Sequence, residues 1–207
     1  REIQPGANAG ITVSVHTVYP LTDKPEDVEA ARRADGIHCT WFSDALLKGK
    51  YPEVVVDYLK ANDDWPDLPE EDMRVIQQPI DFLGVNYYFS RYEIHAPGQW
   101  PLDFASRKTG KPETDMGWEI VPEGLYDQLT RFHERYDGIP LTITENGCAC
   151  RDIVDRNGEV RDANRIDYLH RHLEQVHRAI RDGANVKGYY VWSLMDNFEW
   201  SLGYSKR

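Results

Sequence analysis

The chain has 207 residues, of which 41% are hydrophobic and 12% aromatic, enough for one sizeable globular core and too balanced for a disordered or fibrous protein. Its 35 acidic and 24 basic residues give a net charge of -11 without any basic run, which argues against nucleic acid or a membrane surface as partner. No apolar run approaches the roughly 18 residues of a membrane span and residues 1–6 form no apolar signal core, so we expect a cytoplasmic location.

The first half of the chain predicts two strands separated by helices. Residues Ile11 to Val15 are apolar over the length of a buried strand, and Phe82 to Tyr88 are a second such run. Between them, Pro25 to Leu47 predicts one helix and Val54 to Lys60 another. The stretch 90–121 is rich in Pro, Gly and Trp, and we expect a long loop there.

A helix with one apolar face is predicted after this loop. It opens at Pro122 and ends before Gly138 and Pro140. Its apolar residues are spaced by four, three and four, and they are Leu125, Leu129, Phe132 and Tyr136. A third strand, Leu141 to Thr144, follows directly.

The last predicted helix starts after Asp162 and ends at Gly183. Its expected buried face consists of Ile166, Leu169, Leu173, Val176 and Ile180. Residues Gly188 to Leu194 are predicted to form a fourth strand. Because strands and helices alternate, we expect an α/β fold in which all four strands are parallel, and residues 1–207 to form a single domain.

The three cysteines give no framework for a disulfide or a metal. Cys39, Cys148 and Cys150 are an odd number without a disulfide spacing, so reduced thiols are expected. A zinc site on Cys148 and Cys150 lacks the two further ligands that zinc requires. We therefore expect no metal and no cofactor.

The carboxyl ends of the predicted strands carry side chains suited to sugars. Ligands gather at this edge of a parallel sheet, and the residues there are Asn86, Tyr87, Tyr88, Glu145, Trp192, Asp196, Glu199 and Trp200. Carboxylates and amides bind sugar hydroxyls, and flat aromatic rings cover the C–H faces of sugars. The sequence has no Gly-rich phosphate loop and no G-x-S-x-G motif, so nucleotide binding and serine hydrolysis are not indicated.

Three ordered motifs at these strand ends carry a family resemblance. They are Phe82-Leu83-Gly84-Val85-Asn86-Tyr87-Tyr88, Ile143-Thr144-Glu145-Asn146-Gly147 and Trp192-Ser193-Leu194-Met195-Asp196-Asn197-Phe198-Glu199-Trp200. Together they resemble the family 1 glycoside hydrolases, the β-glucosidase and β-galactosidase family, over essentially the whole chain. The resemblance implies a (β/α)8 TIM barrel and retaining hydrolysis of β-glycosides.

The same resemblance implies a role for each candidate residue. Glu145 corresponds to the nucleophile, and Asn86 and Tyr88 lie beside it. Glu199 and Trp200 correspond to residues that bind sugar hydroxyls. Trp192 corresponds to the floor of the glycone site, and Trp118 to the aglycone side.

The chemistry of retention fits Glu145 independently of the family. One carboxylate must attack the anomeric carbon, and a second carboxyl about 5 to 5.5 Å away protonates the leaving oxygen and later deprotonates water. Glu145 supplies only the first of these groups. A hydrogen bond from the Tyr88 phenol to the charged carboxylate would favour the ionised nucleophile.

Each assignment has a structural alternative. Glu145 before Asn-Gly could be a solvated turn acid, and Trp192 could fill the core. Tyr87 and Tyr88 point to opposite sides of a strand, so one is expected to pack in the core. An exposed Trp200 is costly, which favours a binding role.

Two further side chains are read mainly as structural. Tyr168 is expected in the core or on the surface rather than in the site. Members of the family that the sequence resembles commonly carry an Asn or a Thr in this part of the first strand. We read His16 first as a core histidine and second as a polar lining residue.

Only half of the family's barrel corresponds to this sequence. The four strands match strands five to eight, and the Asn-Glu-Pro motif that carries the general acid/base is absent from the 207 residues. We therefore expect a carboxyl-terminal half-barrel that leaves an apolar face and two strand edges open. We expect a second copy to close it as a homodimer, which needs no second gene, and the alternative is an amino-terminal half on a partner chain. The sequence leaves two functions: the nucleophile half of a β-glycosidase, or a catalytically silent half-barrel that acts as a scaffold or binding protein.

Overall fold

A four-stranded parallel sheet forms the centre of the computed structural model, which describes residues 4–66 and 68–206. Its strands are β1 (Gly10–Val15), β3 (Phe82–Tyr87), β6 (Leu141–Asn146) and β7 (Val186–Val191), in the order β1-β3-β6-β7. All neighbouring pairs are parallel, which confirms the predicted arrangement. β1 and β7 lie at the two ends of the order, so these strands form the edges of the sheet.

Two of the four strands, β6 and β7, have a boundary at least two residues away from the predicted one. β6 continues through Glu145 to Asn146, because the Asn146 carbonyl still accepts a hydrogen bond from the Trp192 amide at 3.0 Å. β7 starts at Val186 and ends at Val191, so the predicted extension to Leu194 is wrong. Leu194 is 96% exposed, and its apolar character therefore does not reflect burial in a strand.

The predicted loop at residues 90–121 contains two strands. β4 (Arg91–His95) pairs with β2 (Val18–Pro20) and with β5 (Phe104–Ser106) in a second, three-stranded sheet. The sequence pattern missed this sheet because the one fully buried position of its central strand, β4, is a carboxyl. Glu93 is fully buried and accepts a hydrogen bond from the Ser106 hydroxyl at 2.5 Å.

Helices α1 (Pro25–Asp35) and α2 (Trp41–Lys48) are joined by a π-helical turn, Gly36–Thr40, which confirms one helical path over the predicted range. The turn contains Gly36, where a Cβ atom would lie 2.4 Å from a methyl group of Val55. α3 (Glu53–Ala61) therefore packs closely on this turn. α4 (Glu70–Ile76) was not predicted.

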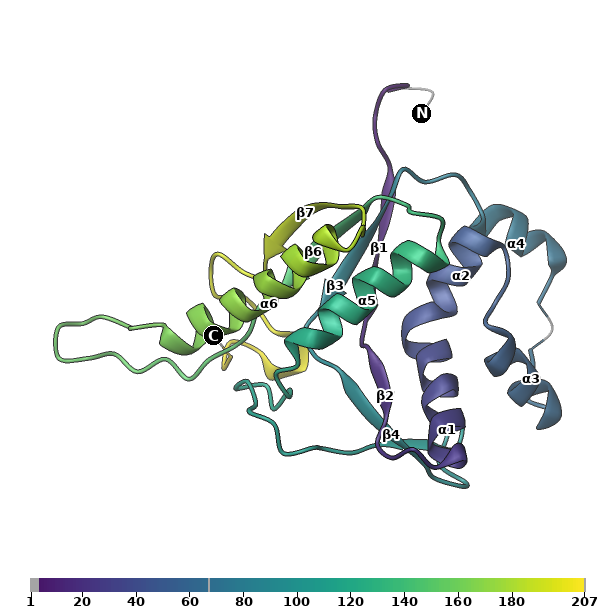
Figure 1. The fold of residues 1–207 in the computed structure, drawn as a ribbon, viewed down its shortest axis with the longest axis horizontal. Coiled ribbons are helices and arrows are strands. Elements are labelled where there is room, and N and C mark those ends of the chain that lie inside the picture. Colours follow the sequence, from purple (N-terminus) through teal and green to yellow (C-terminus); the bar gives the residue numbers. More distant parts are fainter. Residues whose placement is uncertain (1–3, 67, 207) are drawn as a thin grey trace.

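Helices α5 (Pro122–Arg135) and α6 (Ala163–Arg181) pack on one face of the central sheet, in front of it in Figure 1. The buried residues of α5 include Leu125, Leu129 and Phe132, as predicted. Tyr136 follows the end of the helix and is also buried. The core thus lies between α5, α6 and the apolar side of the strands.

The predicted buried face of α6 is wrong at three of its five positions. Ile166, Leu173 and Ile180 are 64%, 45% and 48% exposed. Val176 is buried as predicted, and the other buried side chains of the helix are Tyr168, His172 and Ala179. Two polar aromatics take the core positions because they are hydrogen-bonded: the Tyr168 hydroxyl donates to the Tyr88 carbonyl, and His172 Nδ1 lies 2.7 Å from the Tyr168 carbonyl.

The sheet face opposite the helices differs from the expected apolar surface. It carries small and hydroxyl side chains, namely Thr12, Ser14, Gly84, Asn86, Thr142 and Thr144. A Cβ atom at Gly84 would lie 2.3 Å from Thr12 Oγ1, so glycine permits these strands to approach. Exposed large apolar residues on the sheet itself are found on the edge strands, at Ile11, Tyr190 and Val191, and others lie on α6 and after β7.

Within the described ranges, every helix is too short or too polar to cross a membrane.

Candidate active site

Glu145 lies at the carboxyl edge of the sheet with a phenol beside it. The Tyr88 hydroxyl donates a hydrogen bond of 2.6 Å to Glu145 Oε2. Asn86 on β3 is opposite Glu145 on β6, where the strand register shifts, and Asn86 Oδ1 accepts a hydrogen bond of 2.6 Å from Thr144. The structure therefore brings Glu145, Tyr88 and Asn86 together.

Tyr88 is held in its neutral form. Burial is the main reason that the pKa of Tyr88 lies well above that of an exposed phenol. The hydrogen bond to Glu145 and the charges of Glu145 and Glu199 raise the pKa further. The hydroxyl thus remains protonated at neutral pH, and its proton is directed at the Glu145 carboxylate. This is the hydrogen bond considered from the sequence alone, in which the Tyr88 phenol favours the ionised form of Glu145.

A second layer of side chains fixes the turn that follows Glu145. The fully buried Asn146 donates to the Tyr87 carbonyl at 2.7 Å and to the Tyr168 hydroxyl at 3.2 Å. Its Oδ1 accepts a hydrogen bond of 2.5 Å from Tyr189. Tyr168 and Tyr189 thus support the site from behind; the sequence offered no signal for Tyr189, and Tyr168 was read only as core or surface.

Gly147 is required by a close backbone contact. A Cβ atom at this position would lie 1.9 Å from the Trp192 carbonyl oxygen. The chain after Glu145 therefore runs directly against the residue that follows β7. The contact holds the carboxyl ends of β6 and β7 together at the site.

Trp118 belongs to a row of aromatic rings leading away from Glu145. Its ring lies 5.4 Å from the ring of Tyr88 and stacks on Phe89 at 5.0 Å. His16 also stacks on Phe89, with 4.3 Å between the ring centroids. The pKa of His16 is lowered to about 3, mainly by burial and to a smaller extent by the charges of Arg91 and His38. His16 is therefore a neutral, half-buried member of this row.

The loop that carries Trp118 is organised by the neighbouring carboxylate. Glu119 is 5% exposed and accepts hydrogen bonds from the backbone amides of Thr109, Gly110 and Lys111 at 2.7, 2.7 and 3.1 Å. Burial opposes its ionisation, but the hydrogen bonds outweigh burial and lower the pKa of Glu119. The charged form of Glu119 therefore holds the loop in place.

Glu119→Gln is expected to lower the free energy of unfolding at neutral pH by about 2 kcal/mol, because a neutral amide accepts these hydrogen bonds less strongly. The contribution of Glu119 is present above its unfolded pKa of about 4.3 and is lost as the pH falls through the lower folded value. Urea unfolding at neutral and acidic pH measures the difference. Glu113→Gln, at an exposed ion pair with Lys108, is the matched control. Equal pH dependence of both variants would refute this role.

Trp192 and Glu199 form a pair, whereas Trp200 stands apart. Trp192 follows β7, is 43% exposed, and its Nε1 donates to Glu199 Oε1 at 3.3 Å. Glu199 also lies near enough to Tyr88 to influence its pKa. Trp200 is 86% exposed and, among the described residues, shares no hydrogen bond or ring contact with the other candidates. The expectation that Trp200 avoids exposure is therefore wrong.

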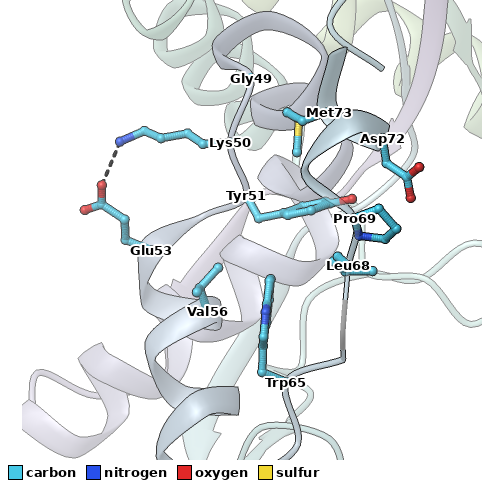
Figure 2. A pocket seen from close by; sticks show the side chains of 10 residues that line it. All are labelled: Gly49, Lys50, Tyr51, Glu53, Val56, Trp65, Leu68, Pro69, Asp72 and Met73. Atoms are coloured by element: carbon cyan, nitrogen blue, oxygen red, sulfur yellow. Dashed lines mark hydrogen bonds and ion pairs between the residues drawn. The ribbon is translucent and has the colours of Figure 1, made fainter. Parts of the chain in front are cut away.

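A separate hollow of about 400 Å³ lies between the start of α3 and α4, as Figure 2 shows. Tyr51 crosses its middle, with Met73 above and Trp65 below in this view. Trp41 stacks on Tyr51 with 4.3 Å between the ring centroids. All lining residues fall between Gly49 and Met73, and none is a predicted sugar-site residue. We regard this hollow as packing of the α2–α4 region and distinct from the site at Glu145.

The chemical capacity of the site follows from its side chains. It presents one carboxylate with a phenol donor, a second carboxylate paired with an indole, an amide and aromatic faces. Across residues 4–66 and 68–206, no three His, Cys, Asp or Glu side chains are grouped so as to hold a metal ion. The arrangement suits nucleophilic attack by a carboxylate on a polyhydroxylated substrate.

Comparison with known proteins places these features in one family. The family model described as glycosyl hydrolase family 1 matches residues 1–207. β-Glucosidase A of Acetivibrio thermocellus is 43% identical over 211 residues, which are 100% of this chain and 47% of that protein. A 1,4-β-D-glucan glucohydrolase of Thermotoga neapolitana is also 43% identical, over 100% of this chain and 48% of its own length.

Solved structures give the same result for the fold. A family 1 β-glucosidase from Thermotoga maritima superimposes with a TM-score of 0.91 at 41% identity, covering 98% of this chain and 45% of that chain. Its complex with isofagomine lactam has a TM-score of 0.90. The chain thus spans about half the length of the relatives it matches, and its four-stranded sheet is half of a TIM barrel.

Proposed function

This chain belongs to glycosyl hydrolase family 1, and on that premise we propose that it is the nucleophile-bearing half of a retaining β-glycosidase that forms a glycosyl-enzyme intermediate on Glu145. The observation that carries the proposal is the 2.6 Å hydrogen bond from Tyr88 to Glu145 at the carboxyl edge of the barrel sheet. That edge is where barrel enzymes hold their substrates.

In the proposed reaction, Glu145 attacks the anomeric carbon of a β-glycoside. Because the Tyr88 hydroxyl donates its hydrogen bond to Glu145 Oε2, the other oxygen, Glu145 Oε1, forms the ester bond with the sugar. The bond to the leaving-group oxygen breaks, and that oxygen takes a proton from a general acid. Water then attacks the anomeric carbon, releases Glu145 and restores the original configuration.

The general acid/base is supplied by residues beyond this sequence, on the same polypeptide or on another. The 207 residues contain no Asn-Glu-Pro motif, and Glu199 is already paired with the Trp192 indole. We propose that a second half-barrel, most simply the amino-terminal half of the family fold, covers the hydroxyl-rich sheet face and brings the acid/base to Glu145. A second copy of this chain would close the sheet without that group.

The other candidates are proposed to bind the sugar. Asn86 orients groups around the reacting carbon, and Glu199 accepts hydrogen bonds from sugar hydroxyls. Trp192 provides the floor of the glycone site, and Trp118 with its aromatic row lines the side of the leaving group. Trp200 belongs to this set by resemblance, and contact with sugar requires that it turn toward the site.

A chimera tests the proposal. The matched segment of Thermotoga maritima β-glucosidase A, 41% identical to this chain, is replaced by residues 1–207. We expect the chimera to hydrolyse an aryl β-glucoside with multiple turnovers. A folded chimera without turnover would instead support the alternative, a catalytically silent half-barrel that serves as a scaffold or binding protein.

A further inference from the structure

Two thiols lie in contact directly after the nucleophile turn. The Sγ atoms of Cys148 and Cys150 are 3.6 Å apart, and both residues are free and half-buried. They follow Gly147, which is fixed against the Trp192 carbonyl. The proposed hydrolysis uses neither thiol.

The segment between the thiols is tied to two other parts of the molecule. The Cys148 carbonyl accepts a hydrogen bond of 3.4 Å from Arg165 on α6. The Ala149 carbonyl accepts one of 2.9 Å from the amide of Asp115, in the loop that carries Trp118. A change of backbone between Cys148 and Cys150 therefore reaches the aromatic side of the site.

We propose that Cys148 and Cys150 form an oxidation site that closes to an intramolecular disulfide when a peroxide is the oxidant. In the first step one thiolate attacks hydrogen peroxide, the O–O bond breaks, and a sulfenic acid and water form. In the second step the other thiol attacks that sulfur and expels the hydroxyl as water. The two thiols together lose two electrons, which reduce one peroxide to two waters.

The surroundings of the pair affect how readily a thiol ionises. The pKa of Cys148 is raised, mainly by burial and next by the neighbouring Cys150. Little of the Cys148 thiolate therefore exists at neutral pH. The attacking species is a thiolate, whichever of the two cysteines reacts first. The overall rate should rise as the pH increases, because more thiolate forms.

Closure would constrain the backbone at Ala149. Two residues of fully extended chain span about 7 Å, whereas a disulfide joins Cα atoms about 4.4 to 6.8 Å apart. Closure must bring the two sulfur atoms from 3.6 Å to about 2.05 Å, which shifts the backbone at Ala149, whose carbonyl holds the Asp115 amide. We expect this hydrogen bond to weaken on oxidation and the loop near Trp118 to move.

The test uses the 207-residue chain, reduced and then treated with hydrogen peroxide. We expect its intact mass to fall by two hydrogens, with the new bond in the peptide that contains both cysteines. Cys39→Ser should oxidise in the same way, because Cys39 is buried elsewhere. Cys150→Ser should not form the bond. Retention of both thiols, or oxygen addition without a disulfide, would overturn the proposal.

A second measurement tests whether the folded structure favours the disulfide, or whether the two cysteines form it only because they are close in sequence. In a glutathione redox buffer, the native chain should form the disulfide at a thiol-to-disulfide ratio about tenfold more reducing than the same chain in denaturing urea. Amide exchange at Asp115 should speed up in the oxidised wild type only. Equal equilibria in both solvents would refute the proposal. Neither readout depends on glycosidase activity, so failure here leaves the proposed function untouched.

Discussion

Glu145→Gln is expected to lower kcat/KM of the chimera for an aryl β-glucoside by about 10⁴-fold, or about 5.5 kcal/mol of transition-state stabilisation. The amide is close to isosteric with the carboxylate and can still accept the hydrogen bond from Tyr88. It lacks the negative charge needed to attack the anomeric carbon and to stabilise an oxocarbenium-like transition state. Thermal unfolding should therefore change little while turnover is lost.

The control for this variant is Glu113→Gln, which removes an exposed carboxylate in the loop near Trp118. We expect that change to leave kcat/KM within about twofold, since exposed ion pairs contribute little. Turnover that survives in Glu145→Gln at the level of the control would remove Glu145 as the nucleophile.

Asp44→Ala is expected to lower the free energy of unfolding by about 3 kcal/mol, because it leaves a partly buried guanidinium without its partner. Asp44 on α2 is 1% exposed and accepts hydrogen bonds from Arg135 Nε at 2.8 Å and from the Tyr136 hydroxyl at 2.9 Å. A second contact joins Arg135 Nη2 to the other carboxylate oxygen. The hydrogen bond to Asp44 also raises the pKa of Arg135, so the arginine stays charged.

Glu29→Ala is the matched control for Asp44→Ala. Glu29 pairs with Arg32 on the surface of α1, and both side chains are about half exposed or more. Removal of such a pair should cost less than about 1 kcal/mol. Urea unfolding measures both variants. If Asp44→Ala lowers the free energy of unfolding no more than Glu29→Ala does, the contact between Asp44 and Arg135 does not stabilise the packing of α2 on α5.

The central sheet could be predicted because its strands are nearly continuous apolar runs. Val13, Val85 and Ile143 are buried, and the apolar pattern marks them directly. The second sheet could not be found in the same way, since its central strand buries the carboxyl of Glu93. On α6 the pattern selected Ile166 and Leu173, whereas hydrogen-bonded Tyr168 and His172 occupy the core.

The candidate site could also be predicted in part from the sequence. Strand ends and family motifs indicated Glu145, Tyr88 and Asn86, and the structure brings them together. The support of Asn146 by Tyr168 and Tyr189 arises only after three distant segments meet, so local patterns could not indicate it. Trp200 lies in a segment after β7 whose residues are mostly exposed, so burial of apolar side chains does not determine its position.

Trapping the glycosyl-enzyme intermediate tests the central claim most directly. The chimera is incubated with 2,4-dinitrophenyl β-glucoside, whose leaving group needs little help from an acid, and is then denatured, digested and analysed by mass spectrometry. We predict a mass increase of one anhydroglucose unit on the peptide that contains Glu145, fragmenting at that residue, and no increase in Glu145→Gln. A glucosyl group on Glu199 or any other carboxylate, with Glu145 unmodified during turnover, would contradict the account.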